Sequence, residues 1–260
     1  MPRLRPVVLR LRPRRSARLL QKLQRQSRGQ RVEGAVTARA ALARLRSLAD
    51  PGSRAGMERF GIRAEKTLGV SMPKLRALAR ECGRDHDLAA RLWESGLHEA
   101  RILASLVDEP DRVTEEQAEQ WAADFDSWDL CDQCCMNLFR RLPFARSLAV
   151  AWSARGEEFV KRAGFALMAT LAVHDGKSND AVFEEFLALV ERESTDGRNF
   201  VRKAVNWALR QIGKRSMALN TKALRTAERI AAIDSPAARW IAADALRELH
   251  DPKIISRIRR

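Results

Sequence analysis

The sequence predicts an all-α protein in which pairs of helices repeat along the chain. Ala, Leu, Arg and Glu, which all favour helix, dominate the 260 residues, whereas Tyr is absent and Gly contributes only 13 residues. From Ala35 onward, apolar residues recur with helical periodicity in runs of about 10–17 residues. This composition and this periodicity favour helices over a large β-sheet domain.

Proline, glycine and capping residues indicate where the predicted helices begin and end. Pro73 and Pro143 stand where a first helical turn would begin, because proline fixes φ and needs no donor there. Thr114 followed by Gln117 has the spacing of a capping box. The expected breaks are Pro51-Gly52, Gly83, Gly96, Glu109-Pro110, Pro143, Gly156, Gly176, Gly197, Gly213 and Ser235-Pro236.

The C-terminal half of the chain repeats itself. The segment EFVKRAGFALMATL (158–171) matches NFVRKAVNWALRQI (199–212) at an offset of 41 residues, and ALRQI (208–212) recurs as ALREL (245–249) at an offset of 37. Two-helix repeats with a period near 40 are typical of HEAT-like arrays. We therefore expect a HEAT-like helical repeat array, an α-α superhelix, with a concave basic face.

The formal net charge of +15 is concentrated at one end of the chain. Residues 1–32 hold 11 Lys and Arg and no acid, and the remainder holds 37 basic against 33 acidic residues. We expect residues 1–32 to be a disordered basic extension, with at most a short helix near 16–28, and residues 33–260 to be a single HEAT-like domain. The extension is interpreted as a solvated or mis-started segment, a non-specific phosphate-binding arm, or an organellar transit peptide.

Several classes of protein and site are disfavoured. No apolar run approaches the roughly 20 residues that span a bilayer. Cys82, Cys131, Cys134 and Cys135 do not form a disulfide framework, because three of them fall in one short helical stretch; a reducing, cytoplasmic compartment fits best. A metal site at Cys131-x-x-Cys134-Cys135 is rejected, because no second Cys or His pair follows. The four scattered histidines, including His98, are expected at the surface or at helix caps.

The predicted helix around residues 199–213 separates a buried stripe from a basic one. Lys203, Trp207, Arg210 and Lys214 lie on the stripe opposite the core, so the Trp207 indole stands among cations. It is interpreted either as an aromatic platform on a phosphate-binding face or as a tryptophan packed between repeats. The buried stripe is expected to consist of Val201, Val205, Ala208, Leu209 and Ile212.

The segment SWDLCDQCCMNLFRR (127–141) places an aspartate beside a tryptophan. Trp128 and Asp132 are four residues apart and are therefore neighbours on a helix. Asp132 is interpreted either as an electrostatic catalyst in a groove or as a solvated acid in the first helical turn, and spacing alone favours the second. Leu130, Cys131, Cys134 and Leu138 are expected in the core, with Trp128, Asp132, Cys135 and Phe139 on a different face.

Four segments together resemble one family. GVSMPKLRALA (69–79), SWDLCD (127–132), FVKRAGFAL (159–167) and FVRKAVNWALRQIGKR (200–215) are similar to the AlkD-type DNA alkylation-repair glycosylases, in order and spacing from about Ala35 to Leu249. The resemblance implies a monofunctional glycosylase that releases purines alkylated at a ring nitrogen from double-stranded DNA and leaves an abasic site. It also implies a bacterial, nucleoid-associated protein, with monomer as the default state and no cofactor.

The resemblance also implies which residues act. The family's triad of two tryptophans and one aspartate corresponds to Trp128, Asp132 and Trp207. The aromatic doublet that usually precedes the aspartate is reduced here to Ser127-Trp128, which bears on substrate range. The expected DNA-contacting cations are Arg162 and Arg210, then Lys203, Lys214 and Arg76.

This chemistry is physically coherent, and two other functions compete with it. A carboxylate such as Asp132 stabilises an oxocarbenium-like sugar, while two indoles hold a cationic purine by contacts worth roughly 0.5–2 kcal/mol each. One alternative is a catalytically silent protein that binds damaged or branched DNA. The other is a HEAT-like scaffold for protein partners, against which the basic stripe around Trp207 argues.

Overall fold

The computed structural model describes residues 36–57, 59, 61–62 and 66–258 of the 260-residue chain. Among these residues every regular element is helical and none is a β-strand. Residues Thr37–Arg260 form one compact unit. The basic segment 1–32, its expected short helix and the expected domain boundary at residue 33 lie outside the described residues.

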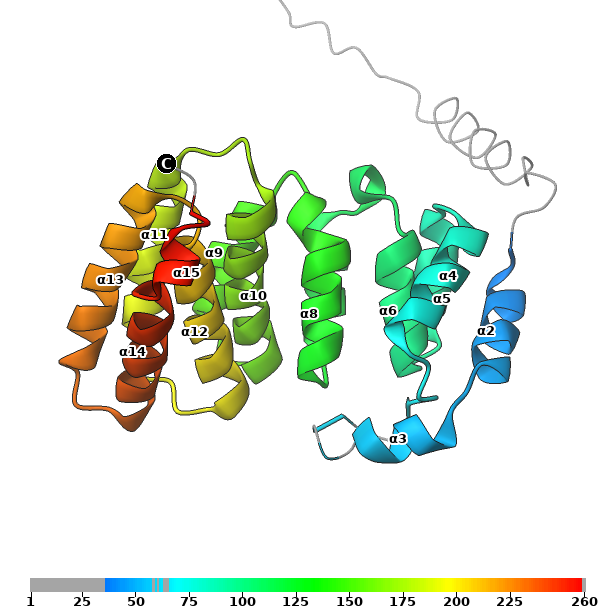
Figure 1. Cartoon of the computed structure of the whole chain (residues 1–260). Helices are drawn as coiled ribbons and strands as arrows, with labels where there is room; N and C mark the ends of the chain where they lie inside the picture. Colours follow the sequence, from blue (N-terminus) through cyan, green and yellow to red (C-terminus); the bar gives the residue numbers. More distant parts are fainter. Residues whose placement is uncertain (1–35, 58, 60, 63–65, 259–260) are drawn as a thin grey trace, which may run out of the picture. The chain divides into compact units, whose positions relative to one another are not determined.

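The helices of the compact unit follow one another along the chain (Figure 1). In chain order they are α2 (Ala38–Ser47), α3 (Pro51–Met57), α4 (Met72–Cys82), α5 (His86–Glu94), α6 (His98–Val107), η3 (Pro110–Arg112), α7 (Glu115–Ala123), α8 (Trp128–Asn137), η4 (Phe139–Arg141), α9 (Ala145–Ser153), α10 (Glu158–His174), α11 (Asp180–Arg192), α12 (Asn199–Gly213), α13 (Met217–Ala231), α14 (Pro236–Leu249) and α15 (Pro252–Ile255).

Local sequence signals account for most of these helix ends. Seven helices begin after a residue whose side chain accepts a hydrogen bond from a backbone N–H of the first turn; these residues are Thr37, Asp85, Thr114, Asn179, Ser216, Ser235 and Asp251. Pro73 stands in the first turn of α4, as expected, whereas Pro143 precedes α9 by two residues. Pro51-Gly52 begins α3 instead of breaking the chain.

The capping box at Thr114 is only half formed. Thr114 Oγ1 accepts from Gln117 N at 3.2 Å, as the spacing predicts. The Gln117 side chain does not return to the Thr114 backbone, because its Nε2 donates to Asp108 Oδ2 at 2.7 Å. A buried carboxylate from the preceding connection thus binds the Gln117 amide, whose Oε1 would accept from the Thr114 N–H in a complete capping box.

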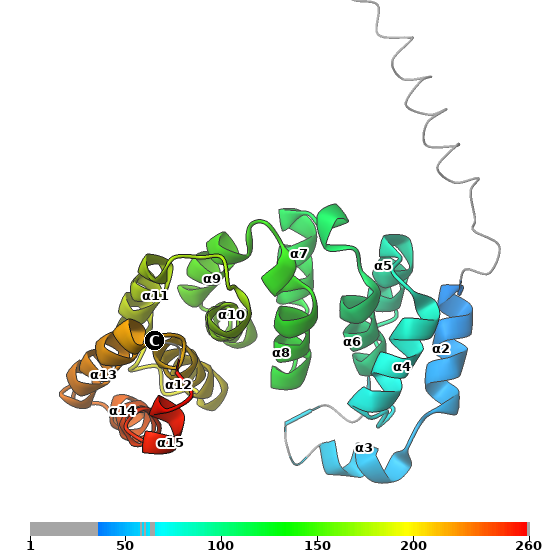
Figure 2. The same cartoon turned by 45° about the horizontal axis from the view of Figure 1, so that its top comes forward.

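The helices from α6 onward pack as two layers. Helices α6, α8, α10, α12 and α14 contact one another in that order, while α9, α11 and α13 form a second row beside them (Figures 1 and 2). Neighbours in the first layer run in the same direction, since Cys131 Sγ faces Phe159 O and Cys135 Sγ faces Ala163 O, one turn further along both helices. This is the helix-pair stacking that the internal repeat predicts.

Three of the six tryptophans belong to the core. The rings of Trp93 and Trp121 stack with centroids 4.0 Å apart, and Trp152 meets Phe139 edge-on at 5.6 Å. The indole N–H groups of Trp93 and Trp152 donate to Asp124 and Glu119. All three tryptophans are buried among aromatic rings and have a structural role.

Helices α9 and α10 meet at a glycine. A Cβ atom at Gly164 would lie 2.5 Å from Ser153 N and 2.9 Å from Ser153 Cα. The two backbones therefore approach more closely than any side chain permits. This contact sets the position of α10, which lies between α8 and α12 in the first layer.

Candidate active site

Asp132 is the centre of a buried ion pair between neighbouring helices. Arg162 of α10 donates from Nε to Asp132 Oδ1 at 2.9 Å and from Nη2 to Oδ2 at 2.8 Å. Its remaining nitrogen, Nη1, donates to Phe200 O in the first turn of α12 at 2.6 Å. Asp132 is 8% exposed and Arg162 6% exposed. The pair thus joins three consecutive helices of the first layer.

Trp128 completes this cluster. It stands one turn before Asp132 on α8 and is half-buried. The Arg162 guanidinium lies 5.9 Å from the centroid of its ring, which is within the range of a cation–π contact. Trp128, Asp132 and Arg162 are therefore brought together, and an indole and a carboxylate share one guanidinium.

The charge of Asp132 is set by two opposing effects. Burial raises the pKa of the Asp132 carboxyl above 3.8, and the charge and hydrogen bonds of Arg162 lower it, with a net upward shift. For Arg162, burial lowers the pKa of the guanidinium, and Asp132 more than restores it. Arg162 thus supplies the positive charge that partly offsets the cost of ionising a carboxylate in this position.

The buried position of Asp132 corrects the expected faces of α8. Leu130, Cys131, Cys134 and Leu138 are fully buried, as predicted. Cys135 and Phe139 were expected on a different face from the core, yet both are fully buried as well. The reason is that α8 packs between α6 and α10 and therefore has two buried sides. Asp132 is not a solvated acid.

Trp207 belongs to a second cluster, on α12. When the Gln211 amide is oriented with its oxygen toward these donors, Trp207 Nε1 and Lys214 Nζ each lie 3.2 Å from that oxygen. Lys214 also donates to Glu248 of α14 at 2.6 Å, and Arg210 pairs with the same carboxylate. The indole is half-buried, so its orientation depends on this chain of polar contacts.

The predicted cations differ in how free their charges are. Arg210 and Lys214 already share Glu248, and Arg162 is bound to Asp132. Lys203 and Arg76 are exposed, on α12 and α4 respectively, and neither has an ion pair among the described residues. Lys203 therefore presents the least compensated charge on the face that carries Trp207.

The two clusters lie on the same layer of helices but at different heights. Arg162 contacts α12 at Phe200, whereas Trp207 follows seven residues later on that helix. At 1.5 Å per residue this places Trp207 roughly 10 Å further along the axis. Between them lies α10, so a ligand that touched both tryptophans would cross that helix.

The buried stripe of α12 agrees with the helical pattern of the sequence. Val201, Val205, Ala208, Leu209 and Ile212 are all fully buried. The stripe with Lys203, Trp207, Arg210 and Lys214 is half-buried or exposed. This one helix therefore supplies both a core face and a basic, aromatic face.

Comparison with known proteins identifies the family. Residues 41–249 match the family of the DNA alkylation repair enzyme. The chain belongs to this family.

A solved structure shares the fold. It is described as "a new family of proteins related to the HEAT-like repeat DNA glycosylases with affinity for branched DNA structures". The two chains superpose with a TM-score of 0.69 and 18% identity, over 81% of this chain and 94% of the other. The architecture of this alkylation-repair family member is therefore HEAT-like, as the repeat period predicts. No curated protein matches the sequence.

Three further features of this alkylation-repair chain concern metal ligands, thiols and membrane spans. Within the described ranges, no group of three or more His, Cys, Asp or Glu side chains is arranged to hold a metal ion. Burial raises the pKa of the Cys131, Cys134 and Cys135 thiols. None of the described helices has the length and apolar character that crossing a bilayer requires.

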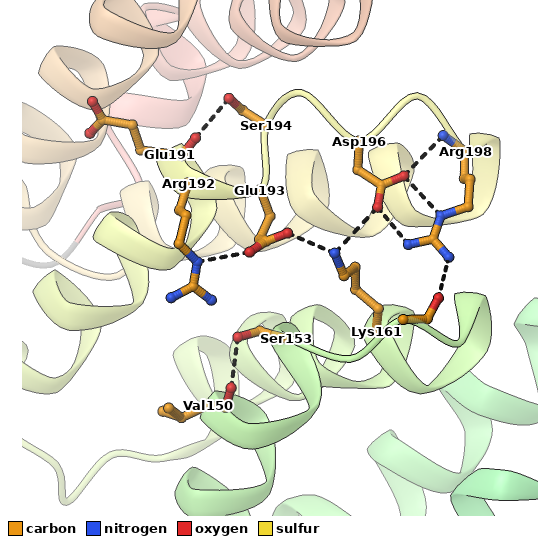
Figure 3. A network of polar contacts seen from close by, with 10 residues as sticks. Val150, Ser153, Lys161, Glu191, Arg192, Glu193, Ser194, Asp196 and Arg198 are labelled. Carbon is orange, nitrogen blue, oxygen red and sulfur yellow. Dashed lines mark hydrogen bonds and ion pairs between the residues drawn. The ribbon is translucent and has the colours of Figure 1, made fainter.

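A polar network that spacing did not indicate positions α12 in this family member. Lys161 Nζ contacts Glu193 Oε2 at 2.7 Å and Asp196 Oδ2 at 3.5 Å (Figure 3). Arg198 pairs with the same Asp196 and donates to Gly156 O at 2.7 Å. The network ties the first turn of α10 to the loop that leads into α12, and so places the helix that carries Trp207.

His98 was expected at the surface or at a cap, yet it is 4% exposed. Its Nε2 lies 2.8 Å from Asp129 Oδ2, in the first turn of α8 beside Trp128. Burial lowers the pKa of His98, but the hydrogen bond and charge of Asp129 outweigh burial and leave the pKa above 6.5. The pair therefore ties the start of α8 to α6, and no local pattern in the sequence signals it.

We expect this pair to make stability depend on pH. Because the pKa of His98 is raised on folding, its contribution to the free energy of unfolding is complete below 6.5 and is lost as pH rises through the folded pKa. Denaturant titrations of wild type and His98→Gln from about pH 5 to about pH 9 should show a difference that shrinks with pH. His250→Gln, at an exposed histidine, is the control. A difference that stays constant would contradict the assignment.

Proposed function

We propose that this chain is a monofunctional DNA glycosylase, acting as a monomer on double-stranded DNA, that releases purines alkylated at a ring nitrogen. The observation that carries the proposal is the Trp128–Asp132–Arg162 cluster, a buried carboxylate held in place beside an indole. Membership of the alkylation-repair family supports it. The catalytic residues are Asp132, Trp128 and Trp207.

The proposed reaction depends on electrostatic stabilisation of the transition state more than on acid catalysis. A purine alkylated at a ring nitrogen is cationic, so the electron pair of the breaking C–N bond leaves with it and neutralises it. The sugar becomes an oxocarbenium-like cation, and water then adds to its anomeric carbon and loses a proton. A fixed carboxylate beside the sugar lowers the energy of that cation.

Asp132 is suited to this role because Arg162 holds it. A carboxylate has about four lone-pair sites, and Arg162 occupies one on each oxygen, which leaves capacity for the sugar or the attacking water. The bidentate pairing fixes the orientation of both oxygens before substrate arrives. We therefore assign Arg162, expected at first to contact the DNA backbone, to the positioning of Asp132.

The tryptophans and the remaining cations bind substrate in this proposal. The faces of Trp128 and Trp207 attract the cationic base and pack on the sugar, at roughly 0.5–2 kcal/mol for each contact. Lys203, Arg210, Lys214 and Arg76 contact phosphates on either side of the modified nucleotide. Because Arg210 and Lys214 share Glu248, their net attraction for phosphate is smaller than that of Lys203.

A catalytically silent DNA-binding protein is the second candidate. Both oxygens of Asp132 are already engaged by Arg162, so the carboxylate has a structural role whether or not it meets a sugar. The solved structure of similar fold is described as having affinity for branched DNA. Such a protein would use the same basic surface without chemistry.

The full chain and alkylated duplex DNA provide the test. We expect release of the free alkylated purine, with abasic sites left in an uncut strand until alkali is added. Binding to the same duplex is measured in parallel at several salt concentrations. Binding without release of the purine would favour the catalytically silent DNA-binding protein. No binding to DNA at all would favour a HEAT-like scaffold for protein partners. Cleavage of the strand without alkali would contradict a monofunctional enzyme.

A further inference from the structure

A cavity lies at the C-terminal end of the layer that carries the candidate site. It has a volume of about 670 Å³ and lies between the ends of α10 and α12 and the short helix α15. Figures 1 and 2 show α15 next to α12 and α14. The polar side chains that line it include Lys214, Arg215, Arg257, His174, Asp180 and Gln211.

The cavity wall is predominantly basic. Arg215 is held rigidly, since its guanidinium pairs with Asp180 and donates to Ala172 O and Ser178 O. Arg257 is exposed and has no ion pair among the described residues. With Lys214, these arginines line the cavity with three cations against the single acid Asp180, and His174 adds an imidazole.

Two more arginines gather beside the same wall. Burial lowers the pKa of His174, and the charges of Arg140 and Arg141 lower it further, which places both guanidinium groups within electrostatic reach of the imidazole. Arg140 donates to Met136 O, and neither arginine pairs with an acid in the described part of the chain. Like charges that repel one another without acidic partners are a typical setting for an anion.

The cavity continues the surface of the candidate site. Gln211 and Lys214 line it, and both also contact the cluster around Trp207. Arg215 follows Trp207 by eight residues and lies just past the end of α12, which corresponds to roughly 12 Å when the helical rise of 1.5 Å per residue is continued. That distance matches roughly three to four nucleotides of a B-form strand, whose rise is about 3.4 Å.

We propose that this cavity, with Arg140 and Arg141 next to it, is a phosphate-binding subsite that holds the DNA backbone about three to four nucleotides from the modified purine. The inference rests on the proposed DNA-binding function and extends it to one flank of the substrate. The shared ligand chemistry is a phosphate group, which DNA or a small phosphate compound can supply.

The test compares two DNA duplexes. One carries the alkylated purine near one end, and the other carries it near the opposite end. Both duplexes are about 20 base pairs long and carry one alkylated purine about three base pairs from an end, so one of them lacks the flank that the subsite would hold. The variant is Arg141→Gln with Arg257→Gln, at two exposed arginines. Arg91→Gln with Arg225→Gln, at exposed arginines of α5 and α13, is the matched control.

Wild type and the control variant are expected to bind the duplex with the complete flank several-fold more tightly than the duplex that lacks it. The subsite variant should bind the two duplexes equally and should lose about 1.8 from the slope of log affinity against log salt, at about 0.9 per phosphate contact. Its rate of base release from saturating DNA lacking that flank should equal that of wild type.

Other results would overturn the inference in distinguishable ways. If the variant keeps the preference and the salt slope while wild type releases base, the subsite is wrong and the proposed function stands. If inorganic phosphate raises the melting temperature of wild type but not of the variant, while DNA binding is unchanged, the occupant is a small phosphate compound. If wild type binds no DNA, both the proposed function and the subsite that rests on it are wrong.

Discussion

Replacing Asp132 with asparagine is expected to slow release of the alkylated purine at least about tenfold. The substitution keeps the shape of the side chain but removes its negative charge. A loss of roughly 1.4 kcal/mol of transition-state stabilisation already gives a tenfold effect, and a preorganised charge in a dry site is usually worth more. The rate is measured in single turnovers on alkylated duplex DNA.

The experiment must separate chemistry from folding, because Asp132 is also the partner of Arg162. Asp132→Asn leaves the Arg162 charge buried with only a neutral acceptor, so we expect lower stability as well as lower activity. The unfolding of each variant is therefore followed under the assay conditions. Asp126→Asn, in the connection before α8, is the control.

Two outcomes would assign different roles to Asp132. A folded Asp132→Asn variant that releases base at the wild-type rate would remove this carboxylate from the mechanism. A variant that binds the alkylated duplex as tightly as wild type but releases base slowly would place the loss in the transition state, as proposed. The rate of base release by Arg162→Lys should lie between those of wild type and Asp132→Asn, because this variant keeps the positive charge and loses the bidentate geometry.

The largest effect on stability is expected at Glu99, a fully buried carboxylate of α6. Its Oε1 accepts from Gly69 N at 2.7 Å and from Val70 N at 3.2 Å, and Leu68 N donates to both oxygens at 2.9 Å. Gly69 has a φ of 77° and a Cβ there would lie 2.2 Å from Asp50 O, so only glycine fits this loop. One carboxylate thus satisfies three backbone donors ahead of α4.

We expect Glu99→Ala to lower the free energy of unfolding by roughly 3–5 kcal/mol, because it leaves three N–H groups without their acceptor in a buried site. Glu99→Gln should cost less, since one oxygen remains. Glu94→Ala, at an exposed glutamate of α5, is the control. Urea unfolding monitored by circular dichroism measures all three variants. A cost for Glu99→Ala below about 1 kcal/mol would mean that water replaces the carboxylate.

The sequence by itself determined the helices, most of their ends and the repeat. The capping residues, the proline in the first turn of α4 and the buried stripe of α12 act within one or two helical turns, so the pattern along the chain contains them. The family could also be predicted from the sequence, since the motifs that resemble it lie within residues 41–249, which match the family. All these signals are local or are carried by residue identity.

Tertiary structure alone decided how the side chains of the site are paired. Asp132 meets Arg162 thirty residues away, His98 meets Asp129 at a separation of 31, and Arg210 meets Glu248 at 38. Each pairing depends on the register between neighbouring helices, which no helical period specifies. For the same reason, α8 has two buried sides where the period predicted one. A single helix determines which residues share a face, and only its neighbours determine which of those faces meets water.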